Sequence, residues 1–525
     1  MKLEGYSIIG SSRSSGTNGT FQAQNPATGE ALEPTYHAAT EDELDRAIAL
    51  AGEAFYTYGN SSSKTRAEFL RNIAGEIDTR EEEIVERMMA ESGLPEGRCR
   101  GEKGRTVGQL RMFAALVEEG SWVDARIDLA QPDRLPIPKP DLRSMRRPLG
   151  PVAVFCASNF PLAFSVAGGD TASALAAGCP VVVRAHSAHP GTAEIVGTAI
   201  QAAVAKSGLH EGVFSLIFDD GIALGQAIAR HPGIHAIGFT GSRSGGRALM
   251  DLAAAREVPI PVFAEMSSVN PVFVLPGAMA ERGEQIAEGL AGSVSLGVGQ
   301  FCTSPGLVFT SGEGKDVFTQ KLADGLGAVA PATMLHQGIA RNFADGVSRL
   351  SAQAGVRKLA EVPADGCQAG PVLFQTSLPD FLSNPALSAE VFGPATLVID
   401  CGSESDFTAA AQSLEGQLTA TVHGTDSDLE NAGPLLALLS QKAGRVIVNS
   451  FPTGVDVCSS MVHGGPYPAT SDGSSSSVGT RAIDRFTRAV SWQGVPESLL
   501  PAELQSTNPL GIQRLVDGVP SRETT

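Results

Sequence analysis

The chain has 525 residues, of which 42% are hydrophobic and 18% charged, and it contains 7 cysteines. These values are typical of a globular protein and exclude the disordered, collagenous and disulfide-scaffold classes. The 39 basic and 57 acidic residues give a net charge of -18. Such a charge repels nucleic acid and anionic lipid, so neither is expected as a partner.

The first third of the chain is predicted to be partly helical. Thr40 and Glu43 have the spacing of a capping box ahead of apolar residues at helical spacing, and a second amphipathic run covers about residues 65–91. Five prolines between residues 131 and 150 then exclude a helix, because proline removes a backbone donor and clashes with the preceding turn. That stretch is predicted to be extended.

From residue 151 onward, short apolar runs alternate with Ala- and Leu-rich helical segments, as in parallel sheets with crossover helices. Strands are predicted at 151–155, 180–184, 213–218 and 234–239, and after residue 265 at 271–275, 307–310, 395–399, 419–423 and 445–449. Two α/β domains are therefore expected in succession. The last 25 residues are predicted to be a loosely attached tail.

The cysteines are odd in number and scattered without a CxxC pair. This pattern argues against a disulfide framework and a zinc ribbon, so a cytoplasmic location and no metal centre are expected. The longest apolar stretch, 161–183, is interrupted by glycines and an aspartate. It cannot supply the roughly 20 apolar residues of a membrane-spanning helix, so the membrane is not expected to be a partner.

Three segments carry candidate chemistry. Cys302 lies in the polar segment 299–304, which is typical of a reactive rather than a packed thiol. Glu265 ends a predicted strand, where α/β sheets place their ligands, and residues 239–246 form a glycine-containing turn able to approach a phosphate. Taken alone, each segment also has a structural explanation. Cys302 could be a packed thiol, Glu265 a helix cap or a solvated acid, and residues 239–246 a tight turn.

Six motifs in order resemble the aldehyde dehydrogenase superfamily: residues 25–30 (NPATGE), 159–162 (NFPL), 239–242 (FTGS), Glu265 with 270–271 (NP), 299–302 (GQFC) and 390–394 (EVFGP). The resemblance implies an α/β fold with a Rossmann-type dinucleotide-binding domain from 7–124 and 145–264 and an α/β catalytic domain from 265–470. It also implies an extended oligomerisation arm from 125–144 and 475–500, followed by a C-terminal tail at 501–525. An arm of this kind should pair with another subunit, so a homodimer or homotetramer is expected.

The same resemblance implies NAD- or NADP-dependent oxidation of an aldehyde to a carboxylic acid. Cys302 is the implied nucleophile, forming a thiohemiacetal and then a thioester. Asn159 is implied in the oxyanion hole and Glu265 as general base, and His463 matches a histidine near the active site of one subfamily. The implied cofactor-binding residues are Cys156, Ser158, Arg184, Ser187, Gly241, Ser242, Gly246, Ser267, Glu390 and Phe392.

One departure from the family pattern bears on the cofactor. Most members carry Lys-Pro-Ser/Ala-Glu where residues 184–187 read RAHS. Loss of the glutamate removes a repulsion against a 2′-phosphate, which Arg184 and Ser187 could bind, so NADP is preferred. NAD is the alternative, with Asp219 or Asp220 as the ribose ligand.

Residues 266–269 (MSSV), Pro305 and segment 451–472 resemble the 2,5-dioxovalerate (α-ketoglutaric semialdehyde) dehydrogenases and the NADP-linked fatty aldehyde dehydrogenases. The first group implies a short aldehyde with a carboxylate, for which Arg105 and Arg111 are the candidate ligands. The second implies an apolar tunnel that Phe160 and Phe164 would line.

Two functions from other classes, a thiol hydrolase and a non-enzymatic protein, are the alternatives to a dehydrogenase. A thiol hydrolase using Cys302 with His463 would need no cofactor, but it leaves the other motifs unexplained. A non-enzymatic protein with this scaffold predicts the loss of Cys302 or Glu265, and both residues are present.

Overall fold

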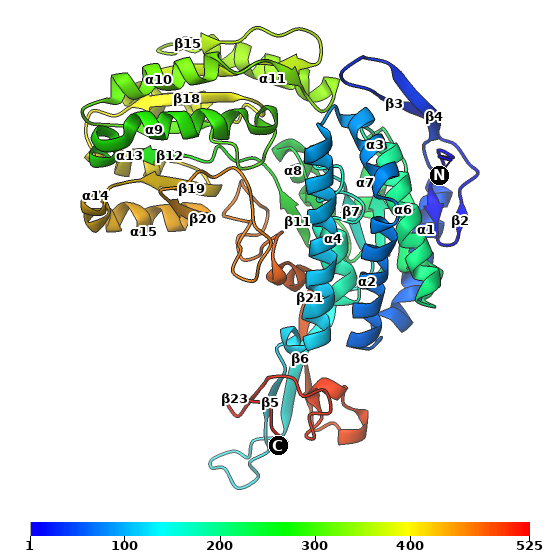
Figure 1. Ribbon diagram of the computed structural model, residues 1–525. Helices are drawn as coiled ribbons and strands as arrows, with labels where there is room; N and C mark the ends of the chain where they lie inside the picture. The colour runs from blue at the N-terminus through cyan, green and yellow to red at the C-terminus, as the bar shows by residue number, and fades with distance from the viewer. Residues whose placement is uncertain (1) are drawn as a thin grey trace.

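The computed structural model describes residues 2–525, which divide between two large sheets and a smaller third one (Figure 1). The first large sheet has the order β11-β10-β7-β8-β9-β1-β2. Five of its strands, from the edge strand β11 to β9, are parallel: β7 (Val152–Phe155), β8 (Val181–Arg184), β9 (Phe214–Ile217), β10 (Ala236–Thr240) and β11 (Val262–Glu265). An antiparallel edge completes the sheet with β1 (Ile8–Ile9) and β2 (Ser12–Arg13).

Alternate residues of these strands face two separate cores, which explains why the strands are apolar throughout. Val152 and Val154 pack with α2–α6, whereas Ala153 and Phe155 pack with α1, α7 and α8. The first layer contains α2 (Ser63–Asp78), α3 (Glu81–Ser92), α4 (Glu96–Glu119), α5 (Gly169–Ala177) and α6 (Pro190–Lys206). The second contains α1 (Glu41–Tyr58), α7 (Ala223–Arg230) and α8 (Arg243–Ala254).

The capping box predicted at Thr40 is present: its hydroxyl accepts from the Glu43 N–H and the Glu43 carboxylate accepts from the Thr40 N–H. The amphipathic run predicted over 65–91 is two helices, because the chain leaves the helix at Thr79 and Arg80 between α2 and α3. A hairpin of β3 (Thr20–Gln24) and β4 (Ala31–His37) precedes them.

The second large sheet has the order β15-β17-β18-β13-β12-β19-β20, with only the edge strand β15 antiparallel. Its strands are β12 (Val272–Val274), β13 (Leu307–Thr310), β15 (Arg357–Glu361), β17 (Val372–Ser377), β18 (Ala395–Asp400), β19 (Gln417–His423) and β20 (Ala443–Val448). A separate short ribbon pairs β14 (Ala332–Thr333) with β16 (Gln368–Ala369). The strands predicted from sequence are confirmed in both sheets to within about two residues at each end.

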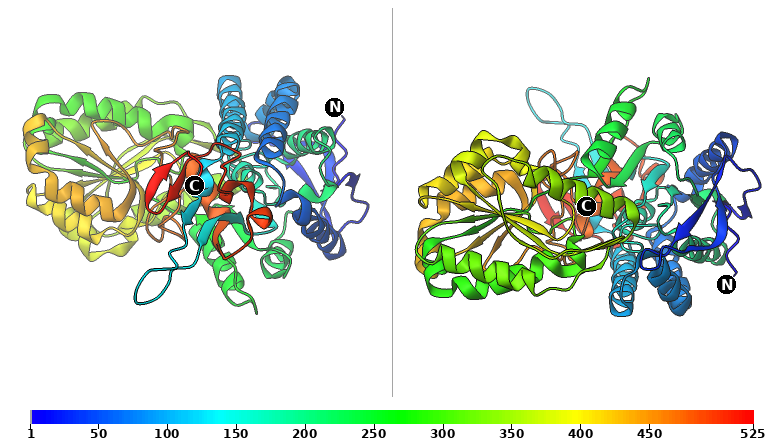
Figure 2. Two further views of the ribbon diagram at one scale, coloured as in Figure 1. Left: turned by 90° about the horizontal axis from the view of Figure 1, so that it is seen from below. Right: turned by 90° about the horizontal axis from the view of Figure 1, so that it is seen from above.

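Helices cover both faces of the second sheet. One face packs on α9 (Pro276–Ser295) and α10 (Lys315–Gly327). The other packs on α12 (Leu378–Ser383), α13 (Ser405–Ser413) and α15 (Gly433–Lys442), while α11 (Gln337–Ser351) and α14 (Asp426–Asn431) complete the domain. The two α/β domains lie side by side, as Figure 2 shows from two directions.

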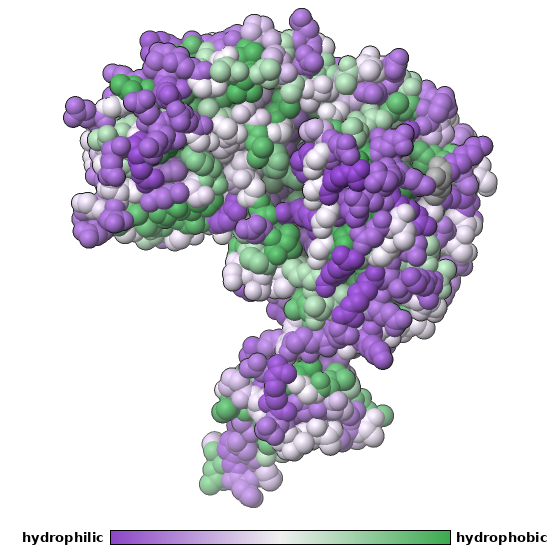
Figure 3. Space-filling model, viewed as in Figure 1, coloured by the Kyte–Doolittle hydropathy of each residue, from purple (hydrophilic) through white to green (hydrophobic). Residues whose placement is uncertain are grey.

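The third sheet forms an arm of order β21-β6-β5-β22-β23 that stands clear of both domains (Figure 3). Its strands are β5 (Arg126–Asp128), β6 (Leu142–Pro148), β21 (Thr487–Gln493), β22 (Arg514–Val516) and β23 (Val519–Ser521). The predicted boundary at residue 144 is wrong, because it falls inside β6.

The loosely attached tail predicted for residues 501–525 is also wrong. β22 pairs in parallel with β5, and Leu504 and Ile512 are buried in a small arm core with Met145. Arg514 is almost fully buried and donates a hydrogen bond of 2.9 Å to the carbonyl of Glu523. These residues are therefore part of the arm.

No helix in residues 2–525 has the length and apolarity that crossing a membrane requires. The structure describes a single chain, so the homodimer or homotetramer and the cytoplasmic location stay predictions.

Candidate active site

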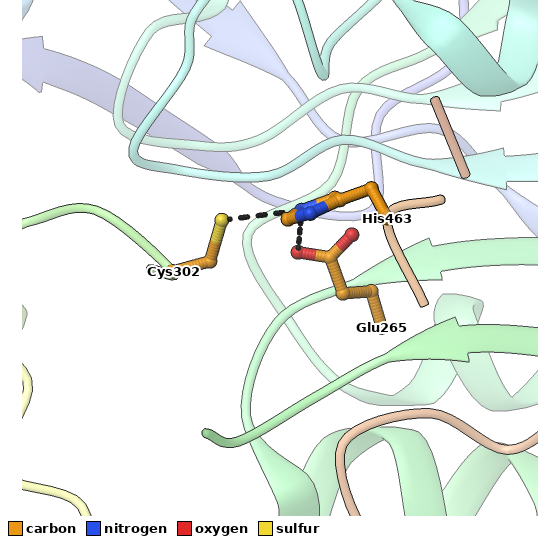
Figure 4. A group of neighbouring side chains, drawn as sticks. All are labelled: Glu265, Cys302 and His463. Carbon is orange, nitrogen blue, oxygen red and sulfur yellow. Dashed lines mark hydrogen bonds and ion pairs between the residues drawn. The ribbon is translucent and has the colours of Figure 1, made fainter. Parts of the chain in front are cut away.

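Cys302, His463 and Glu265 come together between the two α/β domains (Figure 4). The Cys302 Sγ lies 3.4 Å from the His463 Nε2, and the same nitrogen lies 3.0 Å from the Glu265 Oε1. Cys302 is half-buried, whereas Glu265 and His463 are buried. The nucleophile and base predicted from sequence are thus within contact of one histidine.

Glu265 is the last residue of β11, where the chain returning from the second domain pairs with it through a β-bridge to Thr470. The Ser477 hydroxyl donates to the Glu265 Oε2 at 2.8 Å. The backbone of His463 donates to the Ser476 hydroxyl at 3.0 Å and accepts from the Ser477 N–H at 2.8 Å. Segment 476–477 therefore fixes both partners of the nucleophile.

The environment of this cluster shifts the pKa values of Cys302 and Glu265 in opposite directions. Burial raises the pKa of the Cys302 thiol well above its ordinary value, and the charge of Glu265 raises it further. Burial also acts to raise the pKa of Glu265, but the charge of His463 and hydrogen bonds from His463 and Ser477 outweigh it, so that pKa is lowered. The resting site holds a thiol beside a carboxylate.

This arrangement differs from a hydrolase triad. There the acid and the nucleophile contact opposite nitrogens of the imidazole, but here Cys302 and Glu265 meet the same nitrogen of His463. The ring cannot relay a proton from one of its nitrogens to the other between these groups. The three donor atoms lie within 4.8 Å of one another, close enough for a thiophilic cation, but such a cation would occupy the sulfur and block its attack.

Amide side chains hold the nucleophile loop. The Asn159 Nδ2 donates to the Gln300 carbonyl at 3.1 Å, which places the predicted oxyanion-hole amide beside the segment of Cys302. The Asn270 Nδ2 donates to the carbonyls of Cys302 and Ser304, both at 2.9 Å. Sequence reasoning gave Asn270 no role, although its place in a motif could have indicated one.

Aromatic rings and arginines lie next to the nucleophile. The Phe164 ring centroid is 6.3 Å from that of His463 and 5.2 Å from that of Phe160, which in turn is 5.5 Å from Phe301. The Arg105 guanidinium lies 5.9 Å from the Phe164 centroid. Burial lowers the pKa of Arg105, and the nearby Cys302 opposes that shift.

Arg111 does not join this group. It is exposed and forms a 2.6 Å ion pair with Asp78 of α2, because six residues along α4 turn it to another side of the helix from Arg105. Its assignment as a substrate ligand is therefore wrong. Two arginines that sequence reasoning missed lie nearer to the site: Arg98 lies 4.7 Å from the Phe160 centroid, and Arg445 is close enough to Cys302 to interact with it electrostatically. The buried Nε of Arg445 has no hydrogen-bond partner within residues 2–525.

A cavity of about 380 Å³ separates the start of α8 from the second domain, with Arg243, Ser267 and Glu390 in its lining. Ser267 donates to the Glu390 carboxylate at 2.6 Å, and burial raises the pKa of Glu390 to about 7. The Ser242 hydroxyl accepts from the Gly245 N–H at 3.2 Å and caps α8. A capped helix start opening on a cavity whose lining includes Arg243 fits the phosphates of a dinucleotide.

Other predicted cofactor residues serve packing. A Cβ on Gly246 would lie 2.6 Å from the Met266 sulfur, so this buried glycine lets α8 approach β11. The Cys156 side chain packs in the core against α2–α6, which leaves only its backbone for a ligand. Gly241 donates its N–H to the Glu265 carbonyl at 3.1 Å. The side chains of Ser158 and Phe392 are both half-buried.

The two residues proposed for a 2′-phosphate have different surroundings. The Arg184 Nη2 lies 3.0 Å from the Asp219 carboxylate and donates to the Gly221 carbonyl at 2.6 Å. Ser187, together with His186 and His336, lines a cavity of about 200 Å³ whose lining does not include Arg184. Arg184 therefore already has an anionic partner in this structure.

Comparison with known proteins agrees with this geometry. Residues 13–490 match the model of the aldehyde dehydrogenase family. The chain is 50% identical over 522 residues to alpha-ketoglutaric semialdehyde dehydrogenase 2 of Azospirillum brasilense, covering 99% of each chain. It is 47% identical over 514 residues to alpha-ketoglutaric semialdehyde dehydrogenase of Acinetobacter baylyi, covering 96% of this chain and 97% of the relative.

Solved structures support the fold. Gamma-glutamyl-gamma-aminobutyraldehyde dehydrogenase from Burkholderia cenocepacia superposes with a TM-score of 0.80 at 22% identity, covering 94% of this chain and 97% of that one. Betaine aldehyde dehydrogenase from Staphylococcus aureus superposes equally well at 20% identity, covering 94% and 95%. The resemblance and the fold class expected from sequence are confirmed: the chain belongs to the aldehyde dehydrogenase family and is an oxidoreductase that acts on aldehydes.

Proposed function

We propose that the protein oxidises 2,5-dioxovalerate to 2-oxoglutarate, with NAD or NADP as hydride acceptor. The two relatives with 50% and 47% identity are named for that substrate. The observation that carries the proposal for this chain is Arg105, a guanidinium beside the Phe164 ring and close to Cys302. A half-buried arginine next to the nucleophile supplies the donor that a remote substrate carboxylate requires.

The residues of the site take the following roles. The Cys302 sulfur attacks the aldehyde carbon as a thiolate after its proton has passed to water, and the His463 Nε2–H, 3.4 Å away, stabilises that thiolate. The same Nε2–H donates to the Glu265 Oε1 across 3.0 Å and keeps that carboxylate in place. The Asn159 amide stabilises the oxyanion of the thiohemiacetal.

The bound dinucleotide supplies the acceptor for the hydride that leaves the thiohemiacetal carbon. The thioester on Cys302 is then cleaved by water, from which Glu265 accepts a proton. Its lowered pKa keeps the carboxylate ionised and ready for that step.

Replacing Arg105 tests the substrate. For Arg105→Gln, kcat/KM for 2,5-dioxovalerate should fall at least about tenfold through a higher KM, because a charge-assisted hydrogen bond to the substrate carboxylate is lost. The value for butanal, which has no carboxylate, should change less than about threefold. Steady-state kinetics with both aldehydes on one preparation gives the answer.

Arg111→Gln is the matched control, since it removes the same charge from the exposed side of α4 and should leave both values unchanged. Equal losses for the two aldehydes in Arg105→Gln would mean that Arg105 only supports the fold. A higher kcat/KM of the wild-type protein for decanal than for 2,5-dioxovalerate would favour a fatty aldehyde dehydrogenase lined by Phe160 and Phe164.

We also propose NADP as the preferred cofactor, with Arg184 and Ser187 facing its 2′-phosphate. Since Asp219 holds the Arg184 guanidinium at 3.0 Å, the phosphate must compete with that carboxylate. Asp219→Asn should therefore raise the NADP-to-NAD ratio of kcat/KM several-fold, whereas Ser187→Glu should lower it through charge repulsion. A wild-type preference for NAD that Asp219→Asn weakens would instead make Asp219 the ribose ligand.

A further inference from the structure

An ion pair joins the two α/β domains across the cavity that opens at the start of α8. The Arg243 Nη1 lies 2.8 Å from the Glu415 Oε2, and its Nη2 lies 3.2 Å from the Oε1. Arg243 is the first residue of α8, while Glu415 lies between α13 and β19 of the second domain. Both residues line the cavity of about 380 Å³ that also contains Ser267 and Glu390.

The position of Arg243 in its helix is unfavourable for a cation. The start of a helix carries a partial positive charge, which favours acidic residues and bound anions there. The first turn of α8 contains no acidic residue, so the negative charge next to it comes from Glu415 of the other domain. Arg243 is thus placed where an anionic ligand would meet both the guanidinium and the helix N–H groups.

The pair is also free to change partners. The side chains of Arg243 and Glu415 are 44% and 55% exposed, and an ion pair in such contact with water stabilises a fold only weakly. The Tyr467 ring, 5.5 Å from the Arg243 guanidinium, supports one side of it. Release of Glu415 would leave its carboxylate in solvent rather than buried and unpaired.

We propose that Arg243 is a clamp for the diphosphate of the dinucleotide and that Glu415 holds its guanidinium at the cavity until the dinucleotide binds. When the dinucleotide binds, the guanidinium exchanges the Glu415 carboxylate for phosphate oxygens, which it can contact through two parallel hydrogen bonds. Glu415 competes with the cofactor and so limits its affinity. This inference rests on the dinucleotide of the proposed function and is independent of the aldehyde.

The experiment measures the dissociation constants of NADH and NADPH by nicotinamide fluorescence, without aldehyde, for the wild-type protein and single variants. Arg243→Gln should raise the dissociation constant about tenfold or more, because a charge-assisted contact is lost and Glu415 then repels the phosphates. Glu415→Gln should lower it about threefold by removing the competitor. The affinity of Arg243→Gln should also depend less on ionic strength.

Arg247→Gln is the matched control, because Arg247 lies one turn later on α8, pairs with Asp251 at 2.5 Å and does not line the cavity. Its dissociation constants should stay within about twofold of wild type. A bridge that only aligned the domains would give the same sign in Arg243→Gln and Glu415→Gln, with weaker binding in both, and that result would overturn the clamp. An unchanged dissociation constant in Arg243→Gln would overturn it too.

A failure of the proposed substrate leaves these constants untouched, since no aldehyde is present. A wild-type protein that bound neither dinucleotide would overturn the clamp together with the cofactor assignment. Activity measurements with 2,5-dioxovalerate then show which part of the proposed function survives.

Discussion

Cys302→Ala should abolish aldehyde oxidation while leaving dinucleotide binding intact. The sulfur forms the covalent bond to the substrate, and the methyl group of alanine is not a nucleophile. Turnover should fall below about a hundredth of the wild-type value, whereas the dissociation constant for NADPH should stay within about twofold. Reduced nicotinamide formation and fluorescence titration measure the two quantities on the same sample.

Cys458→Ala is a suitable control, because Cys458 is an exposed free thiol outside the cluster of Cys302, His463 and Glu265. It should retain full activity. Residual activity of Cys302→Ala well above a hundredth of wild type would contradict the covalent mechanism, and loss of dinucleotide binding would mean that the variant had distorted the nucleophile loop.

Glu265→Gln should slow turnover about a hundredfold or more and reveal a burst of reduced cofactor. Glutamine keeps the size of the side chain but cannot accept a proton from water, so the thioester on Cys302 should accumulate after the hydride has left. Stopped-flow absorbance should then show a rapid phase approaching one equivalent per active site, followed by slow steady-state turnover.

Ser477→Ala provides the comparison, since it removes the 2.8 Å hydrogen bond to Glu265 and keeps the carboxylate. It should lose far less activity and show no larger burst than wild type. If Glu265→Gln were slow without a burst, Glu265 would act before hydride transfer, on the proton that leaves Cys302.

Local patterns in the sequence predict most of the two large sheets. A buried parallel strand such as β8 (Val181–Arg184) reads as a continuous apolar run, because both of its faces are covered. Glu265 could be placed at a strand end from the same pattern. Its contact with His463, 198 residues later in the chain, depends on how the second domain folds back and has no local signal.

The arginines illustrate what the sequence leaves open. Arg105 and Arg111 lie on one helix, but α4 buries Glu102, Lys103 and Gln109 together with its apolar residues. The periodicity therefore does not reveal which side of α4 faces the site. Arg184 and Asp219 likewise lie where two neighbouring strands, β8 and β9, end. The strand order of the sheet therefore decides that Asp219 is the partner of Arg184.

The arm sheet has a consequence for the synthesis of the protein. β5 has β22 as a neighbour, and Leu129 just beyond β5 is linked to Asp517, 388 residues further along the chain. While the ribosome is still translating that interval, β5 exposes an unpaired edge, although the two α/β domains, completed between β5 and β22, can already fold. Completion of the arm therefore waits for nearly the whole message to be read, and chains released early carry an open strand edge that chaperones and proteases can recognise.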